Sequence, residues 1–380
     1  MNAGYIFMQA LLTTTYISVI VILSTKDINE APGTEIETLD WTYVDSRMPS
    51  RLSDFTATQT IAPDDEGDLN IAIYLIGGCE DSSLSSSVTN SAGELTCNAV
   101  SDATTSFDPH YHKFAMRKQA LRKRHRHVAV AVNGDIWVVG GRDENDAIVR
   151  EVDMYTAARD TWITVGSLGP GLAKSDLTAF ARGDDLYLVG GYDQNYHATE
   201  HTFKIDTVQS LEQNDLVITV LANLNQKRGR LRSLIFGHYG YIVGGYTHED
   251  SFCDSLATTE RYDIKKDEWV FVDSLDEGRG SIGFVKFDGR FFAIGGDKRT
   301  GACGTPSSQS IAVEDAEVYD PFQGINAAWH PVEITKDDGR FRFVAFPWPG
   351  TQHIYVLGGI IDGPVGCNCY FASDKVIQYS

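Results

Sequence analysis

Six glycine pairs recur along the chain, and each closes a run of apolar and aromatic residues of strand length. The first glycines of these pairs are Gly77, Gly140, Gly190, Gly244, Gly295 and Gly358. They follow one another at intervals of 50 to 63 residues. An apolar run this short indicates a strand that is buried on both faces. A unit repeated at this period predicts a solenoid or a propeller.

The residues around each pair define the repeat unit. Short turns such as Asn133-Gly134 and Asp288-Gly289 join the apolar run to a strand before it, because Asn-Gly and Asp-Gly tolerate the positive φ of a hairpin turn. Downstream, three repeats carry a tyrosine that is followed by a tryptophan. These tyrosine–tryptophan sets are Tyr155 and Trp162, Tyr262 and Trp269, and Tyr319 and Trp329. The unit is therefore predicted to be a four-stranded sheet, with strands a to d.

The two ends of the chain complement each other. Residues 375–380 read as strand c of a last sheet that lacks its fourth strand. Residues 39–44 read as an orphan strand d. One sheet assembled from both ends would close a ring and leave no exposed sheet edge.

This pattern resembles the Kelch-repeat family of β-propellers. The glycine pair, the later tyrosine and the tryptophan carry the resemblance, which covers residues 41–380. It implies an all-β fold, a six-bladed β-propeller of Kelch repeats, with the last blade closed by an N-terminal d strand and C-terminal strands a to c. In Kelch adaptors, arginines at the channel mouth bind acidic peptides, so the resemblance also implies an anionic ligand.

Basic residues precede strand a in every repeat, on the face where the d–a and b–c connections of a blade emerge. The candidate ligand-binding residues are Arg51, Arg126, Lys174, Arg230, Arg279 and Arg340, with Arg232 and Arg342 as alternatives of register. Such cations would form bidentate bonds with a carboxylate, sulfate or phosphate. The alternative is that they pair with blade carboxylates such as Glu151, Glu260 and Glu317.

Two classes of function remain open. The leading one is a non-catalytic binding module that engages a protein or an anionic ligand at the d–a/b–c loop face, because no catalytic residues, metal site or cofactor motif is evident. The other is an exported carbohydrate-active enzyme resembling Kelch-type sialic-acid mutarotases, with Glu277 beside Arg279 as its acid–base pair. We expect no cofactor.

The charge balance excludes some partners. The chain has 32 basic and 52 acidic residues and a net charge of -20, which disfavours general nucleic-acid binding. The basic run at residues 117–127 departs from this average. It could be a nuclear-import or nucleic-acid patch or a cleavable loop, or simply a solvated d–a loop.

The N-terminal segment and the cysteines bear on the compartment. Residues 5–23 are apolar and uncharged, which suits a secretory signal or a membrane anchor. We expect a signal peptide or anchor at 1–24, a linker at 25–38 and the propeller at 39–380. This makes the protein secreted or membrane-anchored and extracytoplasmic. The alternative is a cytoplasmic protein whose apolar run is a buried strand or follows a misassigned start. We expect a monomer.

Six cysteines fall in the predicted b–c loops, and an even number fits an oxidising compartment. We predict one bridge between Cys79 and Cys97 and a second between Cys253 and Cys303. Cys367 and Cys369 lie in the last blade, and they could pair with the cysteines of the first blade or bind a metal.

Overall fold

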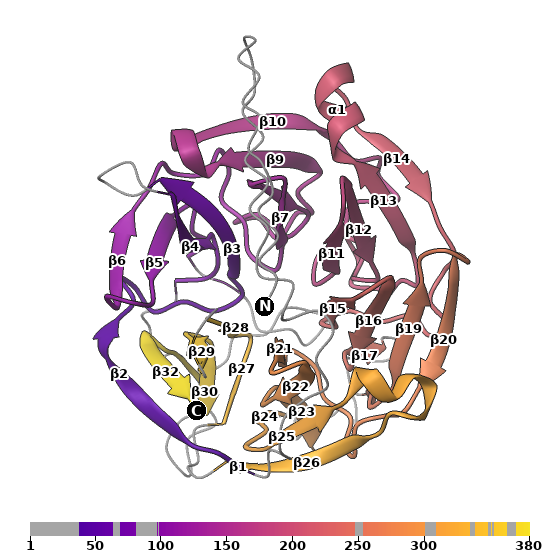
Figure 1. Ribbon diagram of the computed structural model, residues 1–380. Coiled ribbons are helices and arrows are strands. Elements are labelled where there is room, and N and C mark those ends of the chain that lie inside the picture. The colour runs from indigo at the N-terminus through magenta and orange to yellow at the C-terminus, as the bar shows by residue number, and fades with distance from the viewer. Residues whose placement is uncertain are drawn as a thin grey trace, which may run out of the picture.

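The computed structural model arranges its strands as sheets that radiate from a common centre. It describes residues 38–63, 69–80, 97, 99–247, 254–300, 309–334, 339–348, 351, 353–362 and 370–380. In that part of the chain, six sheets contain at least four strands each. In Figure 1 they follow one another in chain order around the centre, each with strand a innermost and strand d at the rim. This confirms the predicted β-propeller.

Each blade is an antiparallel meander. Blade 1 contains β3 (Thr56–Pro63), β4 (Leu69–Ile76), β5 (Thr104–Asp108) and β6 (Lys113–Met116). Blade 2 contains β7 (Val128–Val132), β8 (Asp135–Val139), β9 (Glu151–Thr156) and β10 (Thr161–Ser167). Blade 3 contains β11 (Thr178–Arg182), β12 (Asp185–Val189), β13 (Thr202–Asp206) and β14 (Val217–Val220).

The second half of the chain repeats the arrangement. Blade 4 contains β15 (Arg232–Phe236), β16 (Tyr239–Val243), β19 (Thr259–Asp263) and β20 (Glu268–Val272). Blade 5 contains β21 (Gly283–Phe287), β22 (Arg290–Ile294), β25 (Ala316–Tyr319) and β26 (Trp329–Ile334). Blade 6 contains β28 (Val344–Pro347), β29 (Ile354–Leu357), β32 (Lys375–Tyr379) and β2 (Trp41–Arg47).

The remaining elements are short. Their bounds are β1 (Thr38–Leu39), β17 (Tyr246–Thr247), β18 (Asp254–Ser255), β23 (Asp297–Thr300), β24 (Gln309–Ala312), β27 (Arg340–Phe341), β30 (Ile360–Asp362), β31 (Tyr370–Ala372), α1 (Thr207–Gln213), η2 (Ala157–Arg159) and η3 (Pro321–Asn326). β17 pairs with β18, β23 pairs with β24, and β30 pairs with both β27 and β31. These pairings extend the b–c connections of blades 4, 5 and 6.

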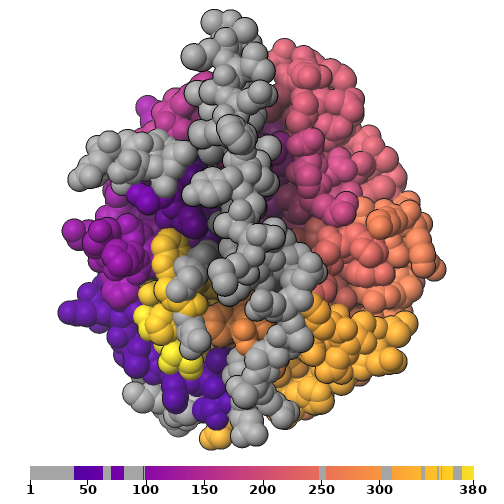
Figure 2. All heavy atoms as spheres, viewed as in Figure 1, coloured from indigo at the N-terminus to yellow at the C-terminus, as the bar shows by residue number. Residues whose placement is uncertain are grey.

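The ring is closed by strands from the two ends of the chain, as predicted. β2 pairs antiparallel with β32, and Trp41 lies opposite Tyr379. β1 then runs parallel to β26 of the neighbouring blade 5. Figure 2 shows the same junction at the surface, where the indigo N-terminal segment adjoins the yellow C-terminal one. A sheet closed in this way has no free edge at the start or end of the ring.

Apolar side chains fill the spaces between neighbouring blades. Trp137 and Val139 of blade 2 pack with Leu186 and Leu188 of blade 3, and all four are buried. The tryptophan of strand d adds a polar link: the indole N–H of Trp269 donates to Thr202 Oγ1 of the preceding blade at 3.2 Å. Its ring also lies 4.8 Å from that of Tyr262. Each blade therefore needs its neighbour to complete its core.

The glycine pairs are required by the approach of the next blade. Gly244 has a φ of +63°, and a Cβ there would lie 2.3 Å from the carbonyl oxygen of Arg279. The N–H of the second glycine, Gly245, donates to the same carbonyl oxygen at 2.9 Å. A side chain would block this contact, which explains why the sequence repeats glycine at this position.

Several predictions fall outside the described residues. The apolar segment 5–23 and the expected linker up to residue 37 lie there, as do Cys253, Cys303, Cys367 and Cys369. Among the helices that are described, none has the length and apolar character needed to span a membrane.

Candidate functional site: the central channel

One residue per blade forms a hydrogen-bonded ring at the start of strand a. This inner ring consists of Asp54, Arg126, Asp176, Arg230, Ser281 and Arg342. The backbone N–H of each residue donates to the carbonyl oxygen of the ring residue before it, and Asp54 donates to Arg342, over distances of 2.8 to 3.1 Å. All six adopt a φ between 53° and 56°. This left-handed conformation is costly outside glycine, and the closed ring of bonds maintains it.

The inner ring lines a central cavity of about 190 Å³ between the six strands a. Four arginines and two aspartates line this cavity: Arg126, Arg230, Arg232, Arg342, Asp54 and Asp176. Further along, the lining includes four alanines, Ala57, Ala129, Ala179 and Ala345. The described part of the lining thus carries an excess of two positive charges inside a chain whose net charge is -20.

Ion pairs surround the acidic members of the ring. Asp54 lies 3.3 Å from Arg342 and 3.5 Å from Arg126, and all three side chains are buried. Burial alone would raise the pKa of Asp54, but the charges of Arg342 and Arg126 outweigh it and lower the pKa to about 2. Asp176 lies 3.9 Å from Arg126 on its other side. Arg126 therefore bridges two carboxylates.

In the opposite half of the ring, fewer carboxylates of the cavity lining stand beside the arginines. Arg230 pairs with Asp297, 3.4 Å away, which belongs to the b–c connection of blade 5 and does not line the cavity. Arg232 is the fourth arginine of the lining, and burial lowers its pKa against the opposing effect of Asp176 and Asp54. Between Arg230 and Arg342 the ring residue is Ser281, which is uncharged. Positive charge is thus concentrated around Ser281.

A second row of arginines, two residues before the inner ring, enters the blades instead of the channel. Arg228 Nη2 donates to Glu260 Oε1 at 2.8 Å, and Nη1 of the same side chain donates to the carbonyl of Gly244 at 3.0 Å. Arg124 makes the equivalent bonds to Asp153 and Gly140. These side chains are fully buried. They join the d–a segment to strands b and c of one blade.

The structure divides the six predicted ligand-binding residues between these environments. Arg126 and Arg230 are inner-ring residues, as is the register alternative Arg342, and Arg232 lines the cavity as well. Arg279 belongs to the second row and pairs with Glu317 and Asp315. It does not line the cavity, and neither do the other three candidates.

Those three candidates have distinct surroundings. Lys174 is buried, and its ammonium donates to the carbonyl of Gly171 at 2.8 Å. Arg340 is buried and donates to the carbonyl of Gly358 at 3.0 Å. Arg51 is exposed. Of the six predicted cations, the structure therefore places two at the cavity, three in the second row and Arg51 in neither row.

The alternative expectation, that the basic residues before strand a pair with blade carboxylates, is confirmed for some of them. Glu317 pairs with Arg279, and Glu260 pairs with Arg228, which the sequence did not single out. Glu151 does not take this role: it is partly exposed and lies 3.7 Å from Arg122. Asp153, on the same strand, contacts Arg124 at 2.5 Å in its place.

The basic run at residues 117–127 consists of an exposed part and a buried part. Residues 117–123 are exposed or partly exposed, as a solvated loop would be. Residues 124–127 are buried and supply the second row, the inner ring and two histidines. Burial, reinforced by the charge of Arg126, lowers the pKa of His125 to about 3, and burial also lowers the pKa of His127 well below its usual value. Four of the eleven residues of the run are thus part of the core.

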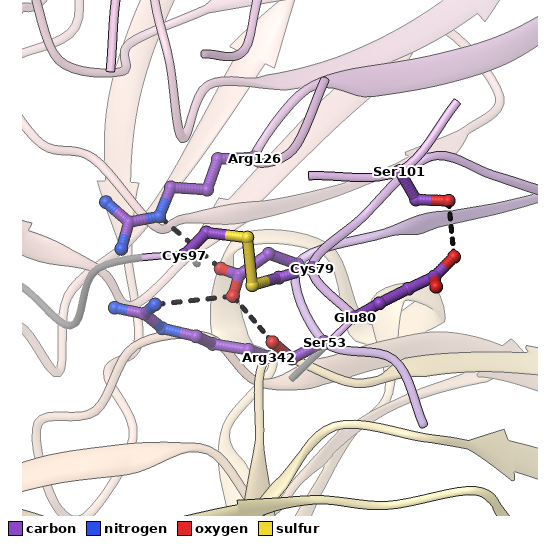
Figure 3. The surroundings of a disulfide bond; sticks show 8 residues. Ser53, Cys79, Glu80, Cys97, Ser101, Arg126 and Arg342 are labelled. Atoms are coloured by element: carbon purple, nitrogen blue, oxygen red, sulfur yellow. Dashed lines mark hydrogen bonds and ion pairs between the residues drawn. A yellow bond between two sulfur atoms is a disulfide. The ribbon is translucent and has the colours of Figure 1, made fainter. Parts of the chain in front are cut away.

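The first predicted disulfide is present beside the inner ring. Cys79 and Cys97 are bonded, and Cys79 pairs through its backbone with Ser53, the residue before Asp54. Figure 3 shows this disulfide next to Arg126 and Arg342, which approach from neighbouring parts of the channel. The Ser53 hydroxyl donates to Asp54 Oδ2 at 2.9 Å. The disulfide therefore anchors the segment that orients Asp54.

Glu277 and Arg279, the acid–base pair expected for a carbohydrate-active enzyme, do not contact each other in the structure. Glu277 is exposed and accepts from Lys298 at 2.6 Å, whereas Arg279 turns toward Glu317. The described residues contain no group of three or more histidine, cysteine or acidic side chains that could bind a metal.

Asp54, Asp176 and Ser281 were missed by reasoning from basic residues alone. A positional signal exists: in four blades the inner-ring residue stands fourteen positions before the first glycine of the pair. These are Arg126, Asp176, Arg230 and Ser281. Counting back from the glycines would have separated the inner ring from the second row.

Comparisons with known proteins agree with this architecture. The family model of the Kelch motif matches residues 123–169 and 230–275. Kelch-like protein 38 of Rattus norvegicus is 23% identical over 301 residues, which cover 75% of this chain and 42% of that protein. Kelch-like protein 26 of Danio rerio is 22% identical over 193 residues, which cover 50% of this chain and 30% of that protein. The chain thus spans less than half the length of these relatives.

A solved structure shares the fold. The structure of YjhT superposes with a TM-score of 0.64 at 12% sequence identity, and the match covers 87% of this chain and 95% of that one. At this identity the likeness concerns the fold alone. The repeated glycine pairs, the closed ring of four-stranded sheets and the matches to Kelch motifs together lead to one conclusion. The chain contains Kelch motifs and has a β-propeller fold.

Proposed function

We propose that this protein is a non-catalytic binding module that engages a protein or an anionic ligand at the face formed by its d–a and b–c connections. The observation that carries the proposal is the charge of the central cavity. Four arginines and two aspartates line it in the described residues, although the chain as a whole is acidic. A local positive field inside an acidic protein favours a compact anionic group over an extended polyanion.

The inner ring is suited to binding because its arginines are preorganised. Arg126, Arg230 and Arg342 are fixed at the backbone by the closed set of hydrogen bonds. Their side chains are also held by ion pairs with Asp54 or Asp297, so they lose little further freedom when they bind a carboxylate. The variable loops around the ring would then provide selectivity.

We also propose that the protein acts outside the cytoplasm. The disulfide between Cys79 and Cys97 supports this, because such bonds persist in oxidising compartments. N-terminal sequencing of the protein recovered from its source cells would test it, since export with cleavage would remove residues near position 24. An intact N-terminus on soluble protein with reduced cysteines would argue against it.

The binding proposal is tested with a fluorescent peptide rich in Asp and Glu. Fluorescence anisotropy would be measured for the wild type, Arg230→Asn and Arg342→Asn, because asparagine tolerates the positive φ at these positions. We expect the dissociation constant to rise at least about tenfold in each variant, the scale of a lost charge-assisted hydrogen bond.

The matched control is Arg159→Asn, which removes the same charge from an exposed position outside the channel. It should leave the affinity within about twofold, since an exposed charge is screened. If Arg159→Asn weakens binding as much as Arg230→Asn does, the peptide binds through general charge attraction and the proposed site is wrong.

A further inference from the structure

The inner ring alternates acidic and basic residues with one interruption. In order around the channel it reads Asp54, Arg126, Asp176, Arg230, Ser281 and Arg342. Ser281 stands where a third acidic residue would complete the alternation. Its neighbours in the ring, Arg230 and Arg342, therefore face each other across a neutral position.

The hydroxyl of Ser281 is a second sign of an incomplete site. The residue is 1% exposed and lines the cavity. Its Oγ has no hydrogen-bond partner among the described residues. Buried hydroxyls are normally bonded, and an exception calls for a ligand or a water. This one borders the cavity beside the two arginines.

The charges around this position favour an anion. Arg232 lies two residues after Arg230 and lines the same cavity. Arg342 forms an ion pair with Asp54, and Arg230 forms one with Asp297. Of these, Asp297 lies outside the lining. One compact anion beside Ser281 would offset the positive charge of the lining.

We propose that the channel binds one small oxyanion of the sulfate or phosphate class between Ser281 and the arginines at positions 230, 232 and 342. The Ser281 hydroxyl and the guanidinium groups would donate hydrogen bonds to its oxygens. The cavity of about 190 Å³ is far larger than the roughly 15 Å³ that a single water requires. The inference rests on the proposed function, because it uses the same arginines. It adds the chemical class of the bound group and names Ser281 as the uncharged ring residue beside which the group binds.

Two substitutions at Ser281 separate charge from shape. Ser281→Asp would complete the alternation and place a carboxylate of the protein where the oxyanion binds. Ser281→Asn has nearly the same shape without the charge, and both residues tolerate the φ of 53° found here. The pair therefore differs only in the property that the proposal concerns.

The experiment is isothermal titration calorimetry with sodium sulfate in a chloride-free buffer at constant ionic strength. We expect one saturable site per wild-type chain, an affinity within about fivefold in Ser281→Asn, and a loss of at least about tenfold in Ser281→Asp. Ser281→Asp should also melt at a higher temperature than Ser281→Asn in the absence of sulfate. Sulfate should raise the melting temperature of Ser281→Asn more than that of Ser281→Asp. If Ser281→Asp binds sulfate as the wild type does, the proposal is wrong.

A second variant covers the case in which Ser281→Asp does not fold. Arg232→Gln removes one cation of the lining from strand β15, where the backbone is regular. It should weaken sulfate binding at least about fivefold. Unchanged sulfate affinity in Arg232→Gln would contradict the inference on its own.

Titration with the acidic peptide distinguishes this inference from the proposed function. If sulfate displaces the peptide competitively, the result supports both the proposed function and the oxyanion inference. It would also show that the carboxylates of a larger ligand and free oxyanions bind at the same site. Peptide binding without any sulfate site would overturn the oxyanion inference and leave the function standing. Failure of the wild type to bind either probe would overturn both.

Discussion

Arg228 and Glu260 meet inside blade 4, where Nη2 of the arginine donates to Oε1 of the glutamate at 2.8 Å and both side chains are fully buried. The same guanidinium donates to the carbonyls of Gly244 and Thr258. Glu260 in turn accepts from the backbone N–H of Asn225 at 2.8 Å. This one pair thus joins the segment before strand a to strands b and c, which identifies it as a structural element of the repeat.

Removing the acid of this pair should strongly destabilise the protein. We expect Glu260→Ala to lower the free energy of unfolding by about 3–5 kcal/mol, because it leaves the Arg228 charge buried without its partner. Urea denaturation followed by tryptophan fluorescence would measure it. The control is Glu277→Ala, which breaks the more exposed pair with Lys298 and should cost at most about 1 kcal/mol. Equal losses in the two variants would contradict a structural role for the buried pair.

A methyl group at Gly244 should be far more costly than one at Gly183. Both glycines have a positive φ, but a Cβ at Gly183 meets no atom within 4 Å, whereas at Gly244 it meets the Arg279 carbonyl oxygen at 2.3 Å. We expect Gly183→Ala to cost about 1–2 kcal/mol from backbone strain. Gly244→Ala should cost about 2–3 kcal/mol more from overpacking. The difference in urea midpoint between the two variants measures the cost of overpacking at Gly244. A negligible difference would show that the neighbouring blade moves away far enough to accommodate the methyl group.

The sequence was sufficient to predict the fold because the fold depends on features that repeat. Each glycine pair marks a place where the next blade comes too close for a side chain, and six such places determine the architecture. The ring closure was predictable as well, since residues 39–44 and 375–380 are incomplete alone and complementary together.

The channel was harder to predict, because two rows of basic residues alternate along one segment. Arg228 and Arg230 are two positions apart, yet the first enters the blade and the second lines the cavity. The difference arises from the positive φ of Arg230, which composition does not reveal. Ser281 could not be recognised at all by a search for charge, because its role in the ring depends on the charges on either side.

Stability should fall as the pH is lowered from 7 to 5. Burial and the charge of Arg126 lower the pKa of His125 to about 3, from an ordinary value of 6.5. The unfolded chain therefore binds a proton in this range that the folded chain does not, and acid favours unfolding. For His125 alone the loss between pH 7 and pH 5 is about 2 kcal/mol. Asp54 adds to it below about pH 4, because its ordinary pKa of 3.8 is lowered to about 2 in the folded chain and the loss falls between these values.

Urea denaturation at pH 7 and at pH 5 would measure this dependence. His125→Asn should reduce the difference between the two pH values, because it removes one of the groups that must stay neutral in the core. His330→Asn, at an exposed position, should leave the difference unchanged. A pH dependence that is the same in wild type and His125→Asn would show that the buried imidazole is not its source.

The disulfide between Cys79 and Cys97 should contribute about 3 kcal/mol, because it closes a loop of 18 residues in the unfolded chain. The double variant Cys79→Ala, Cys97→Ala is expected to lose this amount in urea denaturation. It should also bind the acidic peptide more weakly, since Cys79 pairs with Ser53 and the Ser53 hydroxyl orients Asp54. The stability loss alone would follow from loop entropy. Loss of both would show that the disulfide also holds the acidic side of the inner ring in place. An unchanged free energy of unfolding would contradict the expected stabilisation by the bond.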